Sequence, residues 1–77
     1  MAMVLNNGCL GANIQRLRRS AGLSQEQLVE LMSMLGSNLS RSGLSKIERG
    51  VGNIKEDDLR VIKSILQVDY RLFFEEE

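Results

Sequence analysis

Several residue types are missing or scarce in this 77-residue sequence, and each absence narrows the fold and the chemistry. There is no proline, and aromatic residues make up 4% of the chain, whereas residues that favour helices are plentiful. There is also no histidine, and the sequence holds no nucleophile–base pair and no cluster of metal-ligand residues. These absences favour an all-α protein that is not an enzyme and needs no metal, cofactor or small-molecule ligand.

The single cysteine, Cys9, excludes a disulfide within the chain and fits a reducing cytoplasm. We interpret it as a small, partly buried apolar residue. No apolar run approaches the ~20 residues of a membrane span, and the N-terminus has no basic segment followed by a long apolar run. We therefore expect a cytoplasmic protein with one domain, residues 1–77, and no membrane partner.

The net charge is zero, but the charges are unevenly distributed along the chain. Residues 1–55 carry seven basic and three acidic side chains, and residues 56–77 carry three basic and seven acidic ones. A net charge of zero argues against a nucleic-acid partner. The uneven distribution argues the other way, because it predicts a positive end and a negative end of the molecule.

The spacing of apolar residues predicts five helices with short connections, and no strand. Their inward-facing residues, helix by helix, are Leu10, Ile14, Leu17 and Ala21; Leu28, Leu31, Met32 and Leu35; Leu44 and Ile47; Leu59, Ile62, Ile65 and Leu66; and Tyr70, Phe73 and Phe74. Asn6 or Asn7 can cap the first helix. Gly22, Gly36 and Gly50 follow the first three helices, where a left-handed residue commonly ends a helix.

The second and third helices begin with the same capping device. Ser24 is the cap of the second helix, and Gln27 completes a capping box. Ser40 is the cap of the third helix, and Leu39 before it and Leu44 after it form a hydrophobic staple. Two helices with well-defined starts therefore follow each other across a turn.

The third helix, residues 41–49, is polar where a core helix would be apolar. On a wheel at 100° per residue, Leu44 and Ile47 face inward. The opposite side and its flank present Arg41, Ser42, Ser45, Lys46 and Arg49. Arginine and lysine suit phosphates and guanine edges, and serine can donate or accept at any base. On this helix alone, a solvated face is an equally good interpretation.

The preceding helix shifts the balance toward DNA. Free N–H groups at a helix N-terminus bind phosphate, and Gln25 adds a side-chain donor next to the Ser24 cap. One helix that grips the DNA backbone and another that projects side chains is the division of labour of a helix-turn-helix.

Three segments, IQRLRRSAGLSQEQLVELM, SRSGLSKIERG and LQVDYRLFF, carry a resemblance to a known family. Over about residues 10–74 the sequence resembles the lambda-repressor/Cro-like, or XRE, helix-turn-helix regulators. The resemblance implies a compact five-helix domain, with the helix-turn-helix in helices two and three, that binds palindromic operators in duplex DNA as a repressor-type dimer.

The resemblance also implies roles for individual residues. The residues expected to contact bases from the major groove are Arg41, Ser42, Ser45 and Lys46. The residues expected to contact phosphates are Ser24, Gln25, Arg49 and Asn53. An ion pair between Arg18 and Glu48 is expected to tie the first helix to the third, the alternative being two unrelated surface charges.

Two features depart from the family pattern. Leu28 and Leu44 are sixteen residues apart, about five more than is common. The turn between the two helices usually has about 3–4 residues. Either the second helix is therefore longer, or the turn around residues 36–38 is extended. Gly43 stands where a polar or β-branched residue is common. It weakens the helix by ~1 kcal/mol, and we interpret it as allowing DNA to approach closely.

A homodimer is expected, because one helix reads too few base pairs to be selective. Two copies could read half-sites ~34 Å apart. Leu72 has no assigned core role and is the candidate dimer residue, with the N-terminal segment MAMVL as the other candidate. The competing function is a protein-interaction module on the same fold, without specific DNA binding.

Overall fold

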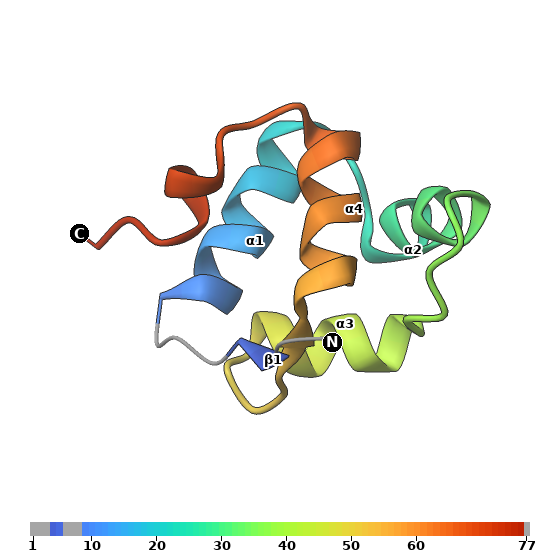
Figure 1. Cartoon of the computed structure of the whole chain (residues 1–77), viewed down its shortest axis with the longest axis horizontal. Coiled ribbons are helices and arrows are strands. Elements are labelled where there is room, and N and C mark those ends of the chain that lie inside the picture. The colour runs from blue at the N-terminus through green and yellow to red at the C-terminus, as the bar shows by residue number, and fades with distance from the viewer. Residues whose placement is uncertain (1–3, 6–8, 77) are drawn as a thin grey trace.

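The computed structural model describes residues 4–5 and 9–76. The elements in chain order are β1 (Val4–Leu5), α1 (Leu10–Ser20), α2 (Gln25–Met34), α3 (Arg41–Glu48), β2 (Ile54–Lys55), α4 (Glu56–Leu66) and the 3-10 helix η1 (Tyr70–Phe73). Figure 1 shows α1 beside α4, α2 projecting to one side and α3 along the lower edge. The prediction of a small, compact, all-helical domain is confirmed for the described residues.

The expected fifth α-helix is instead a short 3-10 helix. α4 ends at Leu66, and the next residue, Gln67, adopts a left-handed conformation with φ 54°. Only four residues then form η1, between Asp69 and Phe74, and so short a piece is typical of 3-10 geometry. Phe73 is fully buried and fixes η1 on the core. The count of five α-helices is therefore wrong.

A pair of two-residue strands also corrects the sequence analysis, which predicted no strand. β1 and β2 are antiparallel, with Val4 opposite Lys55 and Leu5 opposite Ile54. This pairing joins the N-terminal segment to the loop that follows α3. Two residues are too few to show the alternation from which a strand is recognised in a sequence.

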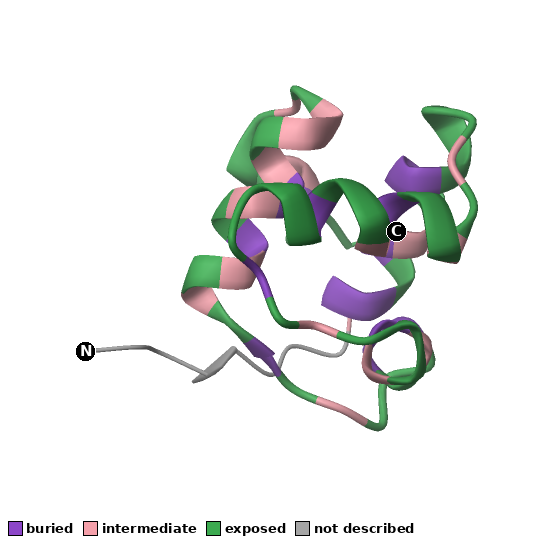
Figure 2. Ribbon diagram, turned by 90° about the vertical axis from the view of Figure 1, so that its right-hand side faces the viewer, coloured by how far each residue is buried: buried purple, intermediate pink, exposed green. Residues whose placement is uncertain are grey.

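The core draws on every element from α1 onward, as the buried segments in Figure 2 show. Its members are Leu10, Ile14, Leu17, Leu28, Met32, Leu44, Ile47, Ile54, Leu59, Ile62 and Phe73. Five residues expected in it are exposed: Ala21, Leu31, Leu35, Tyr70 and Phe74. α2 projects from the body of the protein, so neighbours cover only the stripe through Leu28 and Met32.

The helix ends largely follow the predicted signals. Ser24 and Gln27 form the capping box of α2, and the Ser40 hydroxyl accepts from the Gly43 N–H at 3.0 Å. The glycines after α1, α2 and α3 all have positive φ. Cys9 occupies the N-cap position of α1, whereas the expected caps Asn6 and Asn7 lie outside the described residues.

Asn13 ties the C-terminal segment to α1, a role that the sequence analysis missed. It is buried, and its Nδ2 donates to the carbonyl oxygens of Phe73 and Glu75, both at 2.9 Å. Its position was a usable signal, because Asn13 lies three residues after Leu10 and four before Leu17, within the inward stripe of α1.

Candidate nucleic-acid interface

The outward side of α3 carries the residues expected to contact bases. Arg41, Ser42 and Lys46 are exposed and Ser45 is half-buried. The opposite side of the helix is inserted into the core through Leu44, Ile47 and Glu48. The only acidic residue of α3 thus points inward, and the outward side presents cations and hydroxyls.

A shallow depression of about 330 Å³ joins this side of α3 to the start of α2. The residues that line it are Gln25, Arg41, Ser42, Ser45 and Arg49. Lys46 is exposed beside it on α3. Ser24 remains engaged in the α2 cap, and Asn53 lies at a separate hollow toward α4. The structure therefore brings five of the eight expected contact residues together around one depression.

Glu48 is the centre of a buried polar network beneath that depression. Its carboxylate accepts from Arg18 through two bonds, Nε to Oε2 at 2.7 Å and the terminal nitrogen Nη2 to Oε1 at 2.9 Å. The side chains of Arg18 and Glu48 are only 7% and 0% exposed. Arg18 Nη1 also donates to the carbonyl oxygen of Leu23 at 2.7 Å. One arginine thus connects α1, the α1–α2 turn and the last residue of α3.

Gln25 joins the same network, which the sequence did not predict. Its Nε2 donates to Oε1 of Glu48 at 3.0 Å. The first turn of α2 is therefore attached to the last turn of α3 across the helix-helix junction. A glutamine that appeared in the sequence only as a phosphate donor also orients the two helices relative to each other.

The ionisation of Arg18 and Glu48 follows from this hydrogen-bonded geometry. Burial by itself raises the pKa of Glu48, but hydrogen bonds from Arg18 and Gln25 outweigh it, so the pKa lies below that of an ordinary glutamate. The hydrogen bond to Glu48 raises the pKa of Arg18. Both groups are therefore charged at neutral pH and compensate each other, and the Glu48 charge does not offset the cations on the outward side of α3.

Close backbone packing also holds the C-terminal end of α3. Gly11 of α1 is buried, and a Cβ atom built on it would lie 2.0 Å from the carbonyl oxygen of Ile47. Only a residue without a side chain allows α1 and α3 to approach so closely. The role of Gly11 was not predicted, because a glycine inside a helical pattern gives no sign of which backbone it will meet.

Comparison with protein families gives a match over residues 10–72 to a family model described as a helix-turn-helix domain. The chain belongs to this helix-turn-helix family. The matched residues span all four α-helices and the start of η1. Helix-turn-helix domains bind DNA, and they are typically regulators and not enzymes. Comparisons with curated proteins and with solved structures gave no match.

Within the helix-turn-helix, the structure gives Gly43 a packing role that was not expected. A Cβ atom at this position would lie 2.9 Å from Cδ1 of Leu39 and 3.3 Å from Oγ of Ser40. The position that a side chain of residue 43 would occupy thus faces the turn that precedes α3. Its lack of a side chain makes room for Leu39, while its expected role of admitting DNA stays a prediction.

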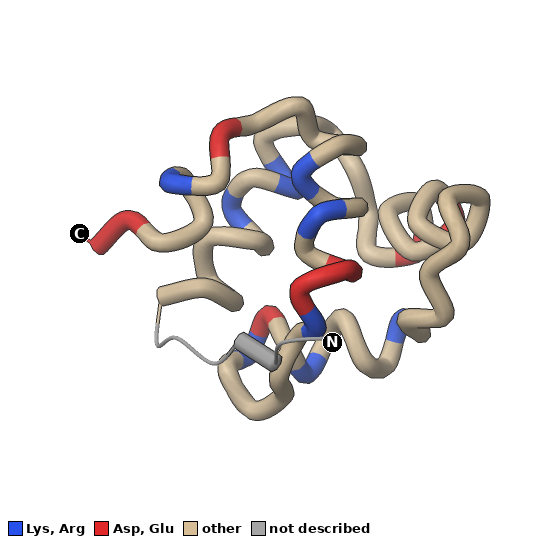
Figure 3. The backbone as a smooth tube through the Cα atoms, in the orientation of Figure 1, with Lys and Arg blue, Asp and Glu red and all other residues tan. Residues whose placement is uncertain are grey.

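The charges of the helix-turn-helix domain are less separated in space than along the chain. Figure 3 shows basic residues along α3 and acidic residues at the start of α4 and near the C-terminus. The acidic start of α4 contacts the turn before α3, since Ser37 is hydrogen-bonded to Asp58. The expected positive and negative ends are therefore only partly realised.

Leu72 differs from the expectation as well. It is half-buried and packs against the core, so it does have a core role.

Tyr70 and Phe74, which were expected to face inward, are 37% and 38% exposed. Together with Glu56, Leu59 and Arg60 they line a groove of about 290 Å³ between α4 and η1. The exposed apolar surface at this end of the molecule is thus aromatic.

Two further findings concern the described part of the chain. Its residues include no group of three or more His, Cys, Asp or Glu side chains placed to hold a metal ion. None of its helices combines the length and the apolar character that crossing a membrane requires.

Proposed function

We propose that the chain is a transcriptional regulator of the lambda-repressor/Cro-like (XRE) type, which acts in the cytoplasm and binds a specific duplex DNA sequence through α3. The observation that carries the proposal is the single depression that joins the start of α2 to the outward side of α3. In this proposal α3 enters the major groove while the start of α2 meets the DNA backbone.

The side-chain chemistry supports this assignment. Arg41, at the first position of α3, can form paired hydrogen bonds with a guanine, and Ser42, Ser45 and Lys46 offer shorter contacts along the same side. Gln25 uses one amide N–H for Glu48, and its second N–H is a donor for a phosphate oxygen. Ser24, Arg49 and Asn53 complete the proposed backbone contacts.

A symmetric dimer is part of the proposal, because one α3 covers too few base pairs to select a site in a genome. Two copies would bind a palindromic operator, in keeping with a repressor-type regulator. The groove beside Tyr70 and Phe74 supports a dimer contact at the C-terminal end.

Because Leu72 packs on the core, Phe74→Ser is a better test of this contact than a change of Leu72. The Phe74→Ser variant should lose cooperative binding to a duplex with two half-sites.

Selection of bound sequences from a random duplex library tests the proposal directly. The wild-type chain should enrich one sequence, and its binding should weaken as salt rises, because phosphate contacts release counterions. Failure to enrich any sequence at low salt would contradict the proposed function.

Titration of Arg41→Ala against the enriched duplex and a scrambled one then assigns the base contact. The loss on the enriched duplex should be about 1–3 kcal/mol, with relaxed preference at one base position. Arg71→Ala, which removes the same charge from η1, is the matched control. Equal losses of Arg41→Ala on both duplexes would remove Arg41 from the base-contacting set.

The alternative is a protein-interaction module on the same fold. It draws support from three apolar residues on the projecting end of α2, since Leu31, Met34 and Leu35 are 37%, 80% and 57% exposed. Binding to random duplex DNA at low salt separates the two functions, because the alternative predicts none.

A further inference from the structure

The turn between α2 and α3 is longer than in most helix-turn-helix domains. Six residues, 35–40, separate the two helices, whereas about 3–4 are usual. Gly36, at φ 94°, ends α2 in a Schellman motif, with N–H bonds from Gly36 to Ser33 and from Ser37 to Met32. The extra residues add backbone freedom, so an additional restraint is needed if the start of α3 is to keep one orientation.

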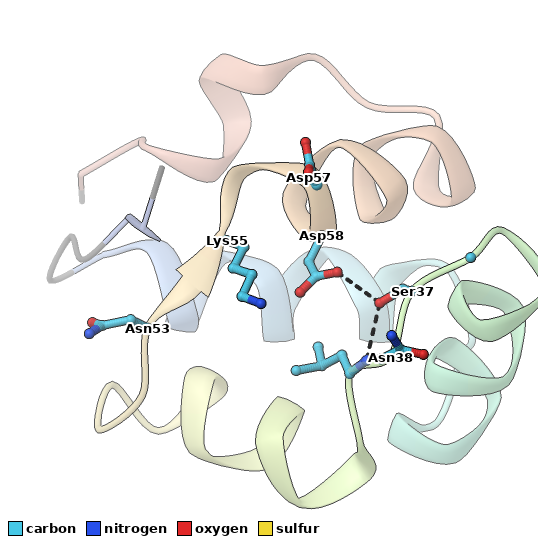
Figure 4. Close-up of a pocket in the computed structure, with 8 residues that line it drawn as sticks. Ser37, Asn38, Asn53, Lys55, Asp57 and Asp58 are labelled. Atoms are coloured by element: carbon cyan, nitrogen blue, oxygen red, sulfur yellow. Dashed lines mark hydrogen bonds between the residues drawn. The ribbon is translucent and has the colours of Figure 1, made fainter. Parts of the chain in front are cut away.

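Ser37 provides a restraint at the middle of this turn. The residue is 9% exposed, and its hydroxyl donates to Oδ1 of Asp58 on α4 at 2.8 Å. The same oxygen accepts from the N–H of Leu39 at 3.2 Å. Leu39 directly precedes Ser40, the cap of α3, so two hydrogen bonds connect α4 to the start of α3 (Figure 4).

A hollow beside Ser37 makes these hydrogen bonds important for holding the turn against α4. A hollow of about 400 Å³ lies between the turn and the start of α4, and its lining includes Asn38, Asn53 and Lys55. Figure 4 shows the hydrogen bond from the Ser37 hydroxyl to Asp58 at this hollow. Because side chains do not fill the space, directional hydrogen bonds set the separation of the turn from α4 there.

We infer that Ser37 and Asp58 form a latch that fixes the N-terminal end of α3, and that they act as positioning residues for base recognition by Arg41 and Ser42. The inference rests on the proposed function, because it assumes that α3 contacts bases. Base contacts carry the sequence preference, whereas phosphate contacts do not. Loss of the latch should therefore reduce the preference for the enriched duplex more than the affinity for random DNA.

The test compares Ser37→Ala, Asp58→Ala and the double variant in the full chain, on the enriched and scrambled duplexes. The ratio of the two affinities should fall about fivefold to tenfold in each single variant, and no further in the double variant. Asp57→Ala is the matched control, because it removes the same charge from the first turn of α4 at an exposed residue whose carboxylate forms a 3.9 Å ion pair with Arg60 instead. An unchanged ratio in Ser37→Ala and Asp58→Ala would overturn the inference.

Amide hydrogen exchange of the DNA-free protein gives a second, independent readout. In Asp58→Ala, exchange at Gly43 and Leu44 should accelerate about tenfold or more through local opening, while exchange at Ile62 in α4 stays as in the wild type. Unchanged exchange at Gly43 and Leu44 would overturn the latch even if the chain enriched no DNA sequence. Failure of the proposed function and failure of the latch are thus distinguished.

Discussion

The two ends of α3 are attached to the rest of the molecule by different means. At the C-terminal end, Glu48 is bonded to Arg18 and Gln25, and the backbone of Ile47 packs on Gly11. At the N-terminal end, α3 follows a six-residue turn whose hydrogen bonds run through Ser37 to Asp58 beside a hollow.

This difference bears on how such a domain could change its DNA preference. The C-terminal end of α3 depends on a buried charge pair and on backbone contact, so most changes there destabilise the fold. The N-terminal end, which carries Arg41 and Ser42, depends on the two hydrogen bonds of one serine hydroxyl, Ser37, beside a hollow. Changes at this end can alter the orientation of the contact residues at a smaller cost in stability.

The largest expected effect breaks the C-terminal attachment. Glu48→Ala leaves the buried Arg18 guanidinium without its carboxylate, and removing one partner of a fully buried pair costs about 3–5 kcal/mol. Denaturant unfolding measures the loss in the free energy of unfolding. A double-mutant cycle with Arg18→Ala should show strong coupling, and a coupling energy near zero would mean that the two charges act independently.

A second, smaller effect concerns the backbone contact at the same end. Gly11→Ala places a Cβ atom on the Ile47 carbonyl oxygen, so α1 and α3 must separate, and overpacking of this kind costs about 1–3 kcal/mol. Ala12→Ser, at the exposed neighbouring position, is the control and should have little effect. Wild-type stability for Gly11→Ala would contradict the close packing.

Acid should weaken the C-terminal attachment selectively. The pKa of Glu48 is lower in the folded chain than that of an ordinary glutamate, so its stabilisation is complete above the unfolded value of ~4.3 and is lost as the pH falls through the folded value. The stability difference between wild type and Glu48→Gln should therefore be constant at neutral pH and shrink below ~4.3. Urea titrations at pH 7 and pH 3 that gave equal differences would contradict this.

The smallest effect is expected from the equivalent glycine change at the N-terminal end. Gly43→Ala gains about 1 kcal/mol of helix propensity, and its Cβ atom meets a flexible leucine side chain and not a backbone oxygen. The net change in the free energy of unfolding should stay within about 1 kcal/mol. A loss as large as that of Gly11→Ala would show that both ends of α3 are packed equally tightly.

The four α-helices, the serine caps and the helix-turn-helix character could be predicted from the sequence, because each depends on residues close together in the chain. Ser24 and Gln27 form their capping box within one turn, and the apolar spacing of α1 and α4 marks their inward sides directly. The pairing of Arg18 with Glu48 was expected from the family resemblance, although the residues are thirty positions apart. The proposed DNA contacts stay predictions at the residue level.

Only the tertiary structure decided which parts of those helices are covered and what the polar residues bond to. Leu31 and Leu35 have the same spacing as Leu28 and Met32, yet they are exposed because no element among the described residues packs over that part of α2. Gln25 bonds to Glu48, and Ser37 bonds to Asp58, across distances in the chain that no local pattern encodes. Periodicity fixes the direction in which a side chain points, but burial and bonding depend on the neighbour that the fold brings to it.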